Sequence, residues 1–211
     1  MLPALERRHD VLALTLPGHA GGPPLDGDVT DDLLADAVER AMDVAGWPTA
    51  HLVGNSLGGH VALQLAARGR ARTVVALAPA GGWAPTDDSR KHLLHLQATL
   101  HETARTAAPH ARGNELLAHQ LLGVARCDAA PAMLEHAARA DWTLDAERIA
   151  CPVRIVWGIE DPLLPWPAAA ARYRGEWLPH ADWVELDGVG HHPQLDAPLE
   201  TAQLILGSTA P

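Results

Sequence analysis

A serine between two glycines, at a predicted strand-to-helix turn, constrains the fold of this chain more than any other feature. Residues 54–58 (GNSLG) follow a short apolar run at 50–53 and open an alanine-rich helical pattern. Glycines two positions before and after Ser56 favour a sharp turn, because larger side chains there are expected to collide with the adjacent strand and helix. Such a turn strains the serine backbone and presents its hydroxyl above the sheet edge, where the helix N-terminus favours an anion. The pattern predicts Ser56 as a nucleophile.

An acid and a histidine follow Ser56 in the chain, each just after a predicted strand. Residues 154–158 (RIVWG) are typical of a buried strand, and Asp161 comes shortly after it. Residues 183–186 (WVEL) are typical of another strand, and the loop after it carries His191 between glycine and histidine neighbours. A serine, then an acid, then a histidine is the chain order of a triad built on a parallel sheet.

Four motifs in this order resemble the α/β-hydrolase family over nearly the whole chain. They are LPGH at 16–19, GNSLGG at 54–59, WGIEDPLLP at 157–165 and GHHPQLDAP at 190–198. The resemblance implies an α/β fold with a mostly parallel sheet, helices on both faces and an inserted helical cap. It also implies a serine hydrolase that cleaves a carboxylic ester or a similar acyl bond through an acyl-enzyme, without a cofactor.

The periodicity of apolar residues supports this architecture. Strands are predicted at 11–16, 50–53, 73–77, 153–157 and 183–186, and helices at 33–45, 57–67, 167–174 and 198–206. The first of these helices begins after Thr30, a residue that favours helix N-caps. Strands alternating with helices at this spacing imply a parallel sheet.

Between Trp83 and Asp145 the pattern changes to helical segments at 93–100, 116–122 and 133–140, with no strand between them. The resemblance identifies this interval as a cap. The expected domain organisation is therefore an N-terminal part of the hydrolase core at 1–82, a cap at 83–147 and a C-terminal part of the core at 148–211.

The resemblance assigns roles to single residues. Ser56 attacks, His191 moves the proton, and Asp161 orients the imidazole. His192 and Glu160 are the neighbours most easily confused with the last two. His191 is preferred because it directly follows a glycine in the loop after the last strand, and Asp161 because it directly precedes a proline, as in the family.

The backbone N–H of Leu57 is the oxyanion donor that this sequence supplies, since it follows the nucleophile. Family members take a second donor from a His-Gly loop after an early strand, and this chain starts beyond it. We therefore expect an N-terminally truncated hydrolase core, with a gap or a distortion between the strands at 11–16 and 50–53. Trp83 and Trp142, at the two ends of the cap, either line an apolar acyl pocket or pack the cap against the core.

Composition limits the other possibilities. A chain of 211 residues with 47% hydrophobic content is long enough to bury the core of one α/β domain. Its net charge of −10 argues against nucleic acid or an anionic membrane surface as a partner. No apolar run approaches the length of a membrane span.

Cys127 and Cys151 lack metal-ligand spacing, and the histidines of the cap lack a third ligand, so no metal is expected. The sequence favours a cytoplasmic protein that acts on a small-molecule acyl substrate.

Serine at position 56 argues against epoxide hydrolases and haloalkane dehalogenases, whose covalent ester requires a carboxylate nucleophile. Two alternatives stay open. The GNSxGG pattern also resembles carbon–carbon bond hydrolases of ring-cleavage products, although these carry an aromatic residue where this chain has His192. A catalytically impaired fragment or a non-catalytic binding protein is the other alternative.

Overall fold

The computed structural model divides the chain into two compact units, and we describe each by itself. The first comprises Met1–Ala13, Glu39–Ala84 and Trp142–Pro211, and the second Leu14–Val38 and Pro85–Asp141. The structure describes residues 1–25, 27, 30–84, 86, 88, 91, 94–95, 98–99, 102–105, 122–130, 132–133, 136 and 142–209.

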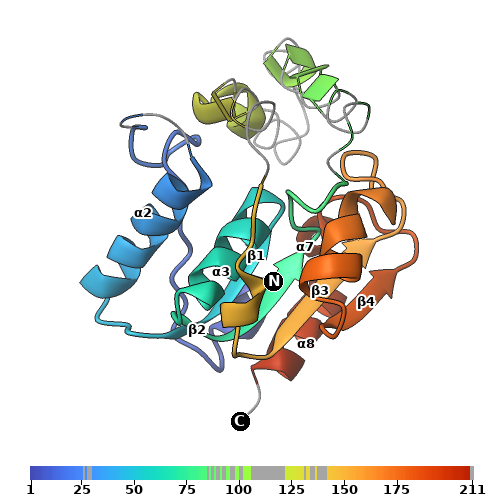
Figure 1. The fold of residues 1–211 in the computed structure, drawn as a ribbon. Helices are drawn as coiled ribbons and strands as arrows, with labels where there is room; N and C mark the ends of the chain where they lie inside the picture. Colours follow the sequence, from blue (N-terminus) through green and yellow to red (C-terminus); the bar gives the residue numbers. More distant parts are fainter. Residues whose placement is uncertain are drawn as a thin grey trace. The chain divides into compact units, whose positions relative to one another are not determined.

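A four-stranded parallel sheet in the order β1-β2-β3-β4 forms the centre of the first unit (Figure 1). Its strands are β1 (Ala50–Asn55), β2 (Ala71–Leu77), β3 (Val153–Gly158) and β4 (Asp182–Leu186). At their last residues, Asn55 pairs with Leu77, and Gly158 pairs with Leu186. The carboxyl ends of the strands therefore meet at one edge, where parallel α/β sheets place their ligands. The predicted α/β fold is confirmed.

The helices agree with most of the predicted boundaries. They are α1 (Leu2–Leu5), α2 (Asp31–Val44), α3 (Leu57–Ala67), α7 (Pro193–Asp196) and α8 (Pro198–Ser208), with a 3-10 turn at Ala146–Arg148. The Thr30 hydroxyl accepts the Leu33 N–H at 3.0 Å, which confirms the predicted N-cap of α2. The helix expected at 167–174 is present as continuous helical backbone over residues 168–177, but it is of mixed type. A 3-10 turn at Ala168–Ala170 leads through α-helical residues 171–172 into a π-helical turn at Tyr173–Trp177.

Apolar side chains cover both faces of the sheet. One cluster consists of Leu5, Val75, Leu77, Val156, Leu186, Val189 and Ile205, and it packs α1 and α8 against one face. Val74 and Ala76 alternate with Val75 and Leu77 along β2 and are also fully buried. Helix α3 packs against β1 and β2. This rigid layer holds the turns at the carboxyl edge of the sheet.

The strand predicted at 11–16 is wrong. These residues form no strand, and Val11, Leu12 and Leu14 are 38–42% exposed, although the apolar run predicted burial on both faces. Strand pairing is not local. Among the described residues only β2 pairs with β1, so no ladder extends to the 11–16 segment. The gap or distortion expected between the segments at 11–16 and 50–53 stays a prediction, because residues 14–16 belong to the second unit.

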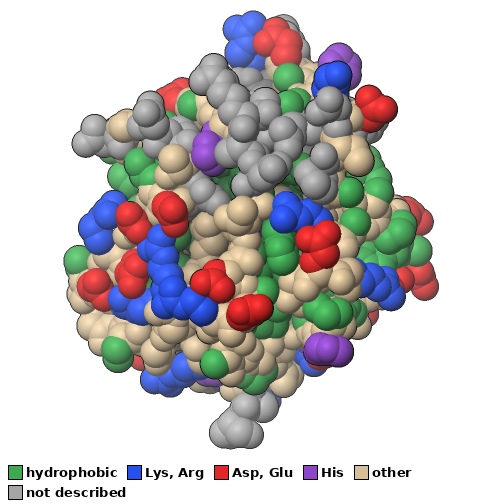
Figure 2. Space-filling model, viewed as in Figure 1, with side chains coloured by type: hydrophobic (Ala, Val, Ile, Leu, Met, Phe, Trp, Pro, Cys, Tyr) green, Lys and Arg blue, Asp and Glu red, His purple; other side chains and the backbone are tan. Residues whose placement is uncertain are grey.

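Charged side chains of both signs are interspersed on the face that Figure 2 shows. Glu39 forms ion pairs with Arg68 at 3.0 Å and with Arg70 at 2.9 Å, and Arg70 also pairs with Asp43 at 2.6 Å. Arg70 donates further to the backbone carbonyls of Pro48 and Trp47, and so fixes the turn that leads into β1. Within the described residues, none of the helices has the length and hydrophobicity to span a bilayer.

Stability is expected to fall as the pH drops below about 6.5, in part because of His51 on β1. Burial is the largest cause that lowers the pKa of His51 from 6.5, and the neighbouring His9 and Arg72 lower it further. Between the lowered pKa of the folded state and 6.5, the unfolded chain binds more protons than the folded chain. The stabilising contribution is thus complete above pH 6.5 and is lost as the pH falls through the folded-state pKa.

Urea unfolding of wild type and His51→Gln between pH 5 and pH 8 measures this contribution. The variant is expected to show a flatter pH dependence over the lower half of that range. The exposed His180→Gln change is the matched control and keeps the wild-type slope. Identical slopes for His51→Gln and wild type would contradict the assignment.

Candidate active site

Three turns at the carboxyl edge of the sheet carry the residues that the sequence singled out. Ser56 directly follows β1, Asp161 follows β3 and His191 follows β4. The turns after β3 and β4 are joined by a backbone hydrogen bond of 3.1 Å from the Glu160 N–H to the Val189 carbonyl. The parallel register therefore gathers residues far apart in the chain at one edge of the sheet.

The turn at Ser56 has the strained backbone that the sequence predicted. Its φ of 54° and ψ of −119° lie in a region that residues other than glycine rarely adopt. The Ser56 N–H donates to the Leu77 carbonyl at 2.9 Å, and the Ser56 carbonyl accepts the N–H groups of Gly59 and Ala80 at 3.0 Å each. These bonds to β2 and α3 hold the strained conformation in place. Strained backbone conformations that surrounding hydrogen bonds maintain are concentrated at functional sites.

The glycines around Ser56 differ in how much space a side chain would find at each position. A Cβ at Gly54 would overlap the backbone of Gly58 and Gly59, so only glycine fits there. A Cβ at Gly58 would meet no described atom within 4 Å, so the expected collision at this position is wrong. The close approach falls one residue later, where a Cβ at Gly59 would lie 3.1 Å from both the Gly54 carbonyl and Pro79. Gly58 is open because the first turn of α3 directs it away from the sheet.

We expect Gly54→Ala to lower the melting temperature by several degrees and to reduce hydrolytic turnover by at least about 10²-fold, because the turn that presents Ser56 must shift. Gly58→Ala is the matched control. It adds the same methyl group in open space within a helix, and is expected to keep the wild-type melting temperature or to raise it slightly. Melting curves and ester turnover of the two variants, measured side by side, check this. Equal effects of the two substitutions would refute the assignment.

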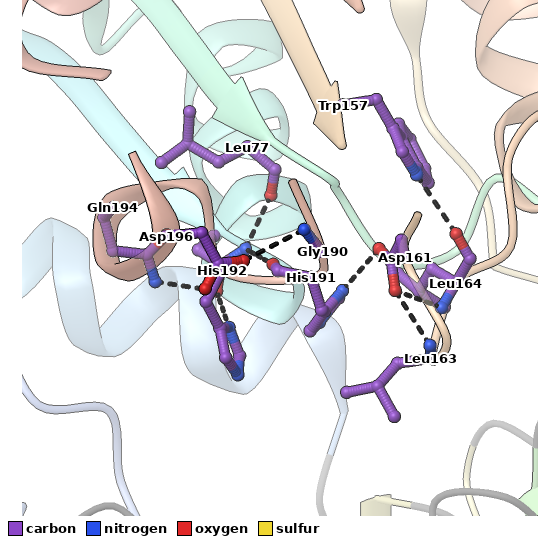
Figure 3. A network of polar contacts seen from close by, with 11 residues as sticks. Leu77, Trp157, Asp161, Leu163, Leu164, Gly190, His191, His192, Gln194 and Asp196 are labelled. Atoms are coloured by element: carbon purple, nitrogen blue, oxygen red, sulfur yellow. Dashed lines mark hydrogen bonds and ion pairs between the residues drawn. The ribbon is translucent and has the colours of Figure 1, made fainter. Parts of the chain in front are cut away.

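Asp161 and His191 form a buried hydrogen-bonded pair (Figure 3). The His191 Nδ1 lies 2.7 Å from Asp161 Oδ2. The other carboxylate oxygen, Oδ1, accepts the N–H groups of Leu163 and Leu164 at 2.8 Å each. Trp157 supports the same turn by donating its indole N–H to the Leu164 carbonyl at 3.1 Å. The sequence preference for Asp161 over Glu160 and for His191 over His192 thus agrees with the pair that makes contact.

The pair fixes which nitrogen of His191 can act as a base. Because the Asp161 carboxylate can only accept, His191 Nδ1 must carry the proton and donate. In the neutral ring Nε2 then keeps its lone pair, as a general base requires. Leu57 is the first residue of α3, so its N–H has no acceptor within the helix and remains able to bind an anion.

A second polar network joins Asn55, at the end of β1, to the segment that follows His191. Asn55 Oδ1 accepts hydrogen bonds from His192 Nδ1 at 2.9 Å and from Gln194 Nε2 at 3.1 Å. Partial burial lowers the pKa of His192, and the adjacent His191 lowers it further, which favours a neutral ring. Sequence reasoning did not find Asn55 or Gln194, because their contact joins segments 139 residues apart.

His60, on α3, is fully buried. Its Nδ1 lies 2.8 Å from the hydroxyl of Tyr173, which donates to the Ala80 carbonyl at 2.7 Å. Trp142 packs edge-on against His60 with ring centroids 4.7 Å apart, and Trp83 packs on Trp142 at 5.8 Å. Both tryptophans are buried in these contacts, which favours packing. Their part in a substrate pocket stays a prediction.

The segment expected to form the cap, with its histidines, falls largely outside the described residues. Within the helices expected at 93–100, 116–122 and 133–140, the structure describes residues 94–95, 98–99, 122, 133 and 136, and these are helical. The other positions lie outside the described residues, and the division at 83 and 147 stays a prediction. In the part of the chain that the structure describes, no group of three or more His, Cys, Asp or Glu residues is placed to hold a metal ion. Cys127 and Cys151 are both free thiols.

Known proteins resemble this chain in sequence and in fold. The model of the alpha/beta hydrolase family matches residues 1–204. "Epoxide hydrolase EphH" of Mycobacterium tuberculosis is 34% identical, with 82% of this chain and 92% of the relative covered. A "Pimeloyl-[acyl-carrier protein] methyl ester esterase" of Neisseria meningitidis is 30% identical, over 92% of this chain and 81% of the relative. The crystal structure of a hydrolase from Pseudomonas aeruginosa superposes with a TM-score of 0.78 at 20% identity, covering 100% of this chain and 83% of that one.

Proposed function

Because the chain belongs to the alpha/beta hydrolase family, we propose that it is a serine hydrolase that cleaves a carboxylic ester, or a similar acyl bond, through an acyl-enzyme at Ser56. The observation that carries the proposal is the buried hydrogen bond of 2.7 Å between Asp161 and His191. That bond lies at the sheet edge where the strained turn presents Ser56. Acyl transfer requires a nucleophilic serine and a base that an acid orients, and the strained turn of Ser56 and the Asp161–His191 pair lie at the same edge of the sheet.

The proposed reaction has two halves. In the first, His191 Nε2 takes the Ser56 proton as the Ser56 oxygen adds to the substrate carbonyl. The Leu57 N–H donates to the oxyanion that forms. Collapse of this intermediate breaks the bond to the alcohol, which leaves with the proton from His191. In the second half, water adds to the acyl-enzyme by the same route and releases the acid and free Ser56. Asp161 stays ionised and stabilises the imidazolium in both halves.

An ester fits this site better than an epoxide, despite the printed name of the relative from Mycobacterium tuberculosis. Opening an epoxide through a covalent ester requires a carboxylate nucleophile, and this chain has Ser56 at that position. The relative from Neisseria meningitidis is named as an esterase, in keeping with a serine nucleophile. In this proposal the segment 83–147 forms a cap that shapes the acyl site, and Trp83 and Trp142 lie at its two ends.

A substrate panel tests the proposal and its alternatives. The purified chain is offered a p-nitrophenyl ester with a short acyl chain, a vinylogous 1,5-diketone and an aryl epoxide. We expect a burst of p-nitrophenol followed by steady turnover of the ester, and no opening of the epoxide. Faster cleavage of the diketone would replace the ester assignment with carbon–carbon hydrolysis. A protein that melts cooperatively and turns over none of the three would identify a non-catalytic member of the family.

A further inference from the structure

The amide of Asn55 forms four hydrogen bonds, which is every bond that such a group can make. The Nδ2 atom donates to the carbonyls of Leu77 and His191 at 3.0 Å each. The Oδ1 atom accepts from His192 Nδ1 at 2.9 Å and from Gln194 Nε2 at 3.1 Å. A complete set of four bonds leaves this amide no free donor or acceptor for a substrate.

The chemistry of the partners fixes the orientation of the amide. Backbone carbonyls can only accept, so the nitrogen of Asn55 must face Leu77 and His191. Its oxygen must then face His192 and Gln194, and both of these have to donate. His192 therefore carries its proton on Nδ1, which agrees with the lowered pKa that favours a neutral ring. A reversed amide would turn its oxygen toward the carbonyls of Leu77 and His191 and would lose both of those bonds.

The side chain of Asn55 joins the end of β1 to the end of β2 and to the segment that carries His191. Asn55 is the last residue of β1 and directly precedes Ser56, and its backbone pairs with Leu77 at the end of β2. Its amide holds the backbone of His191 itself, rather than a more distant part of the loop. Figure 3 shows the His191 ring directed toward Asp161. His192 and Gln194 donate instead to Asn55 Oδ1.

We propose that Asn55 is a positioning residue that sets the place of the His191 imidazole relative to Ser56, by tying the His191–Gln194 segment to the ends of β1 and β2. This inference rests on the proposed function, since it concerns the same site. A displacement of about 1 Å at a reacting group lowers turnover by about 10²-fold. The side chain acts through His191 and touches no reacting atom.

The test replaces the amide with a carboxylate of the same shape. Asn55→Asp keeps an oxygen that accepts from His192 and Gln194. It replaces the Nδ2 amino group with a second oxygen, which cannot donate to the carbonyls of Leu77 and His191, so both of those bonds are lost. Gln203→Glu makes the same chemical change at an exposed position of α8 and is the matched control. We expect Asn55→Asp to lower kcat for the ester about 10²-fold while KM changes less than about threefold, with Gln203→Glu unchanged in both.

A second readout does not depend on turnover. The proton on His191 Nδ1, bonded to Asp161, is expected to give a downfield NMR signal in wild type and in Gln203→Glu. In Asn55→Asp this signal is expected to broaden or shift. If wild type hydrolyses no ester, the proposed function fails. The comparison of the NMR signal between wild type and Asn55→Asp still tests whether Asn55 positions His191. A folded Asn55→Asp protein with an unchanged signal and unchanged kcat would overturn it.

A double variant covers the case in which Asn55→Asp does not fold. His192→Ala with Gln194→Ala removes the two donors to Asn55 Oδ1 without introducing a charge, and leaves the bonds to Leu77 and His191 in place. We expect a smaller loss of kcat, about tenfold, with KM again nearly constant. Wild-type kcat in this double variant, or a loss confined to KM, would overturn the proposal.

Discussion

Ser56→Ala is expected to lower ester turnover by at least about 10⁴-fold while the protein keeps its fold, because no other hydroxyl is held in the strained turn. His191→Ala is expected to lower ester turnover by a similar factor, because Ser56 is a weak nucleophile without a base to take its proton. The double variant is expected to be no slower than either single variant, because residues that act as a unit have non-additive effects. Steady-state kinetics of the three proteins measure this.

Two substitutions away from the site serve as matched controls. Ser208, near the end of α8, donates its hydroxyl to the Leu204 carbonyl at 3.2 Å, and Ser208→Ala is expected to retain wild-type turnover. His180→Ala removes an exposed imidazole and is expected to be neutral as well. Additive losses in the Ser56→Ala and His191→Ala double variant would indicate that the two residues act independently, which the proposed mechanism does not allow.

Asp161→Asn is expected to lower kcat by about 10⁴-fold with little change in melting temperature. In wild type the N–H groups of Leu163 and Leu164 donate to Asp161 Oδ1, and the amide oxygen of the variant can accept the same two bonds. The amide nitrogen then faces His191 Nδ1 and donates to it. The imidazole must accept at Nδ1 and carry its proton on Nε2, the atom that has to take the Ser56 proton. The expected loss of kcat therefore comes from the wrong tautomer of His191 and not from a change in packing.

Glu160→Gln makes the same chemical change one residue earlier and is the matched control. Glu160 is exposed, whereas the Asp161 side chain is fully buried. Wild-type kinetics are expected for Glu160→Gln, with the pH dependence of kcat/KM unchanged. If instead Glu160→Gln lost turnover and Asp161→Asn kept it, the acid of the site would have to be reassigned.

The parts of the site that sequence could predict are those that local chemistry determines. Helix α3 begins and ends where the pattern predicted, and the turn before it has the expected strained serine, because the glycines of residues 54–59 act within one turn of chain. The resemblance to the family's motifs favoured Asp161, which precedes a proline, and His191, which follows a glycine, over their neighbours. Their contact then follows from the parallel register of β3 and β4.

The predictions that failed depend on contacts between distant segments. The apolar run at 11–16 has the composition of a buried strand, but a strand also requires a partner, and pairing cannot be read from one segment. Gly58 was expected to be crowded, yet the three-dimensional course of the turn places the close contact at Gly59. The bonds of Asn55 to His191, 136 residues later, leave no periodic signal in the sequence.

The most direct test of the central claim is covalent labelling followed by intact-protein mass spectrometry. A fluorophosphonate reacts only with a serine that a neighbouring base has activated, so one adduct is expected on wild type, and peptide mapping is expected to locate it at Ser56. Ser56→Ala is expected to remain unlabelled, and Asp161→Asn to label far more slowly than wild type. A folded wild-type protein without an adduct, or an adduct that persists in Ser56→Ala, would contradict the assignment of Ser56 as the nucleophile.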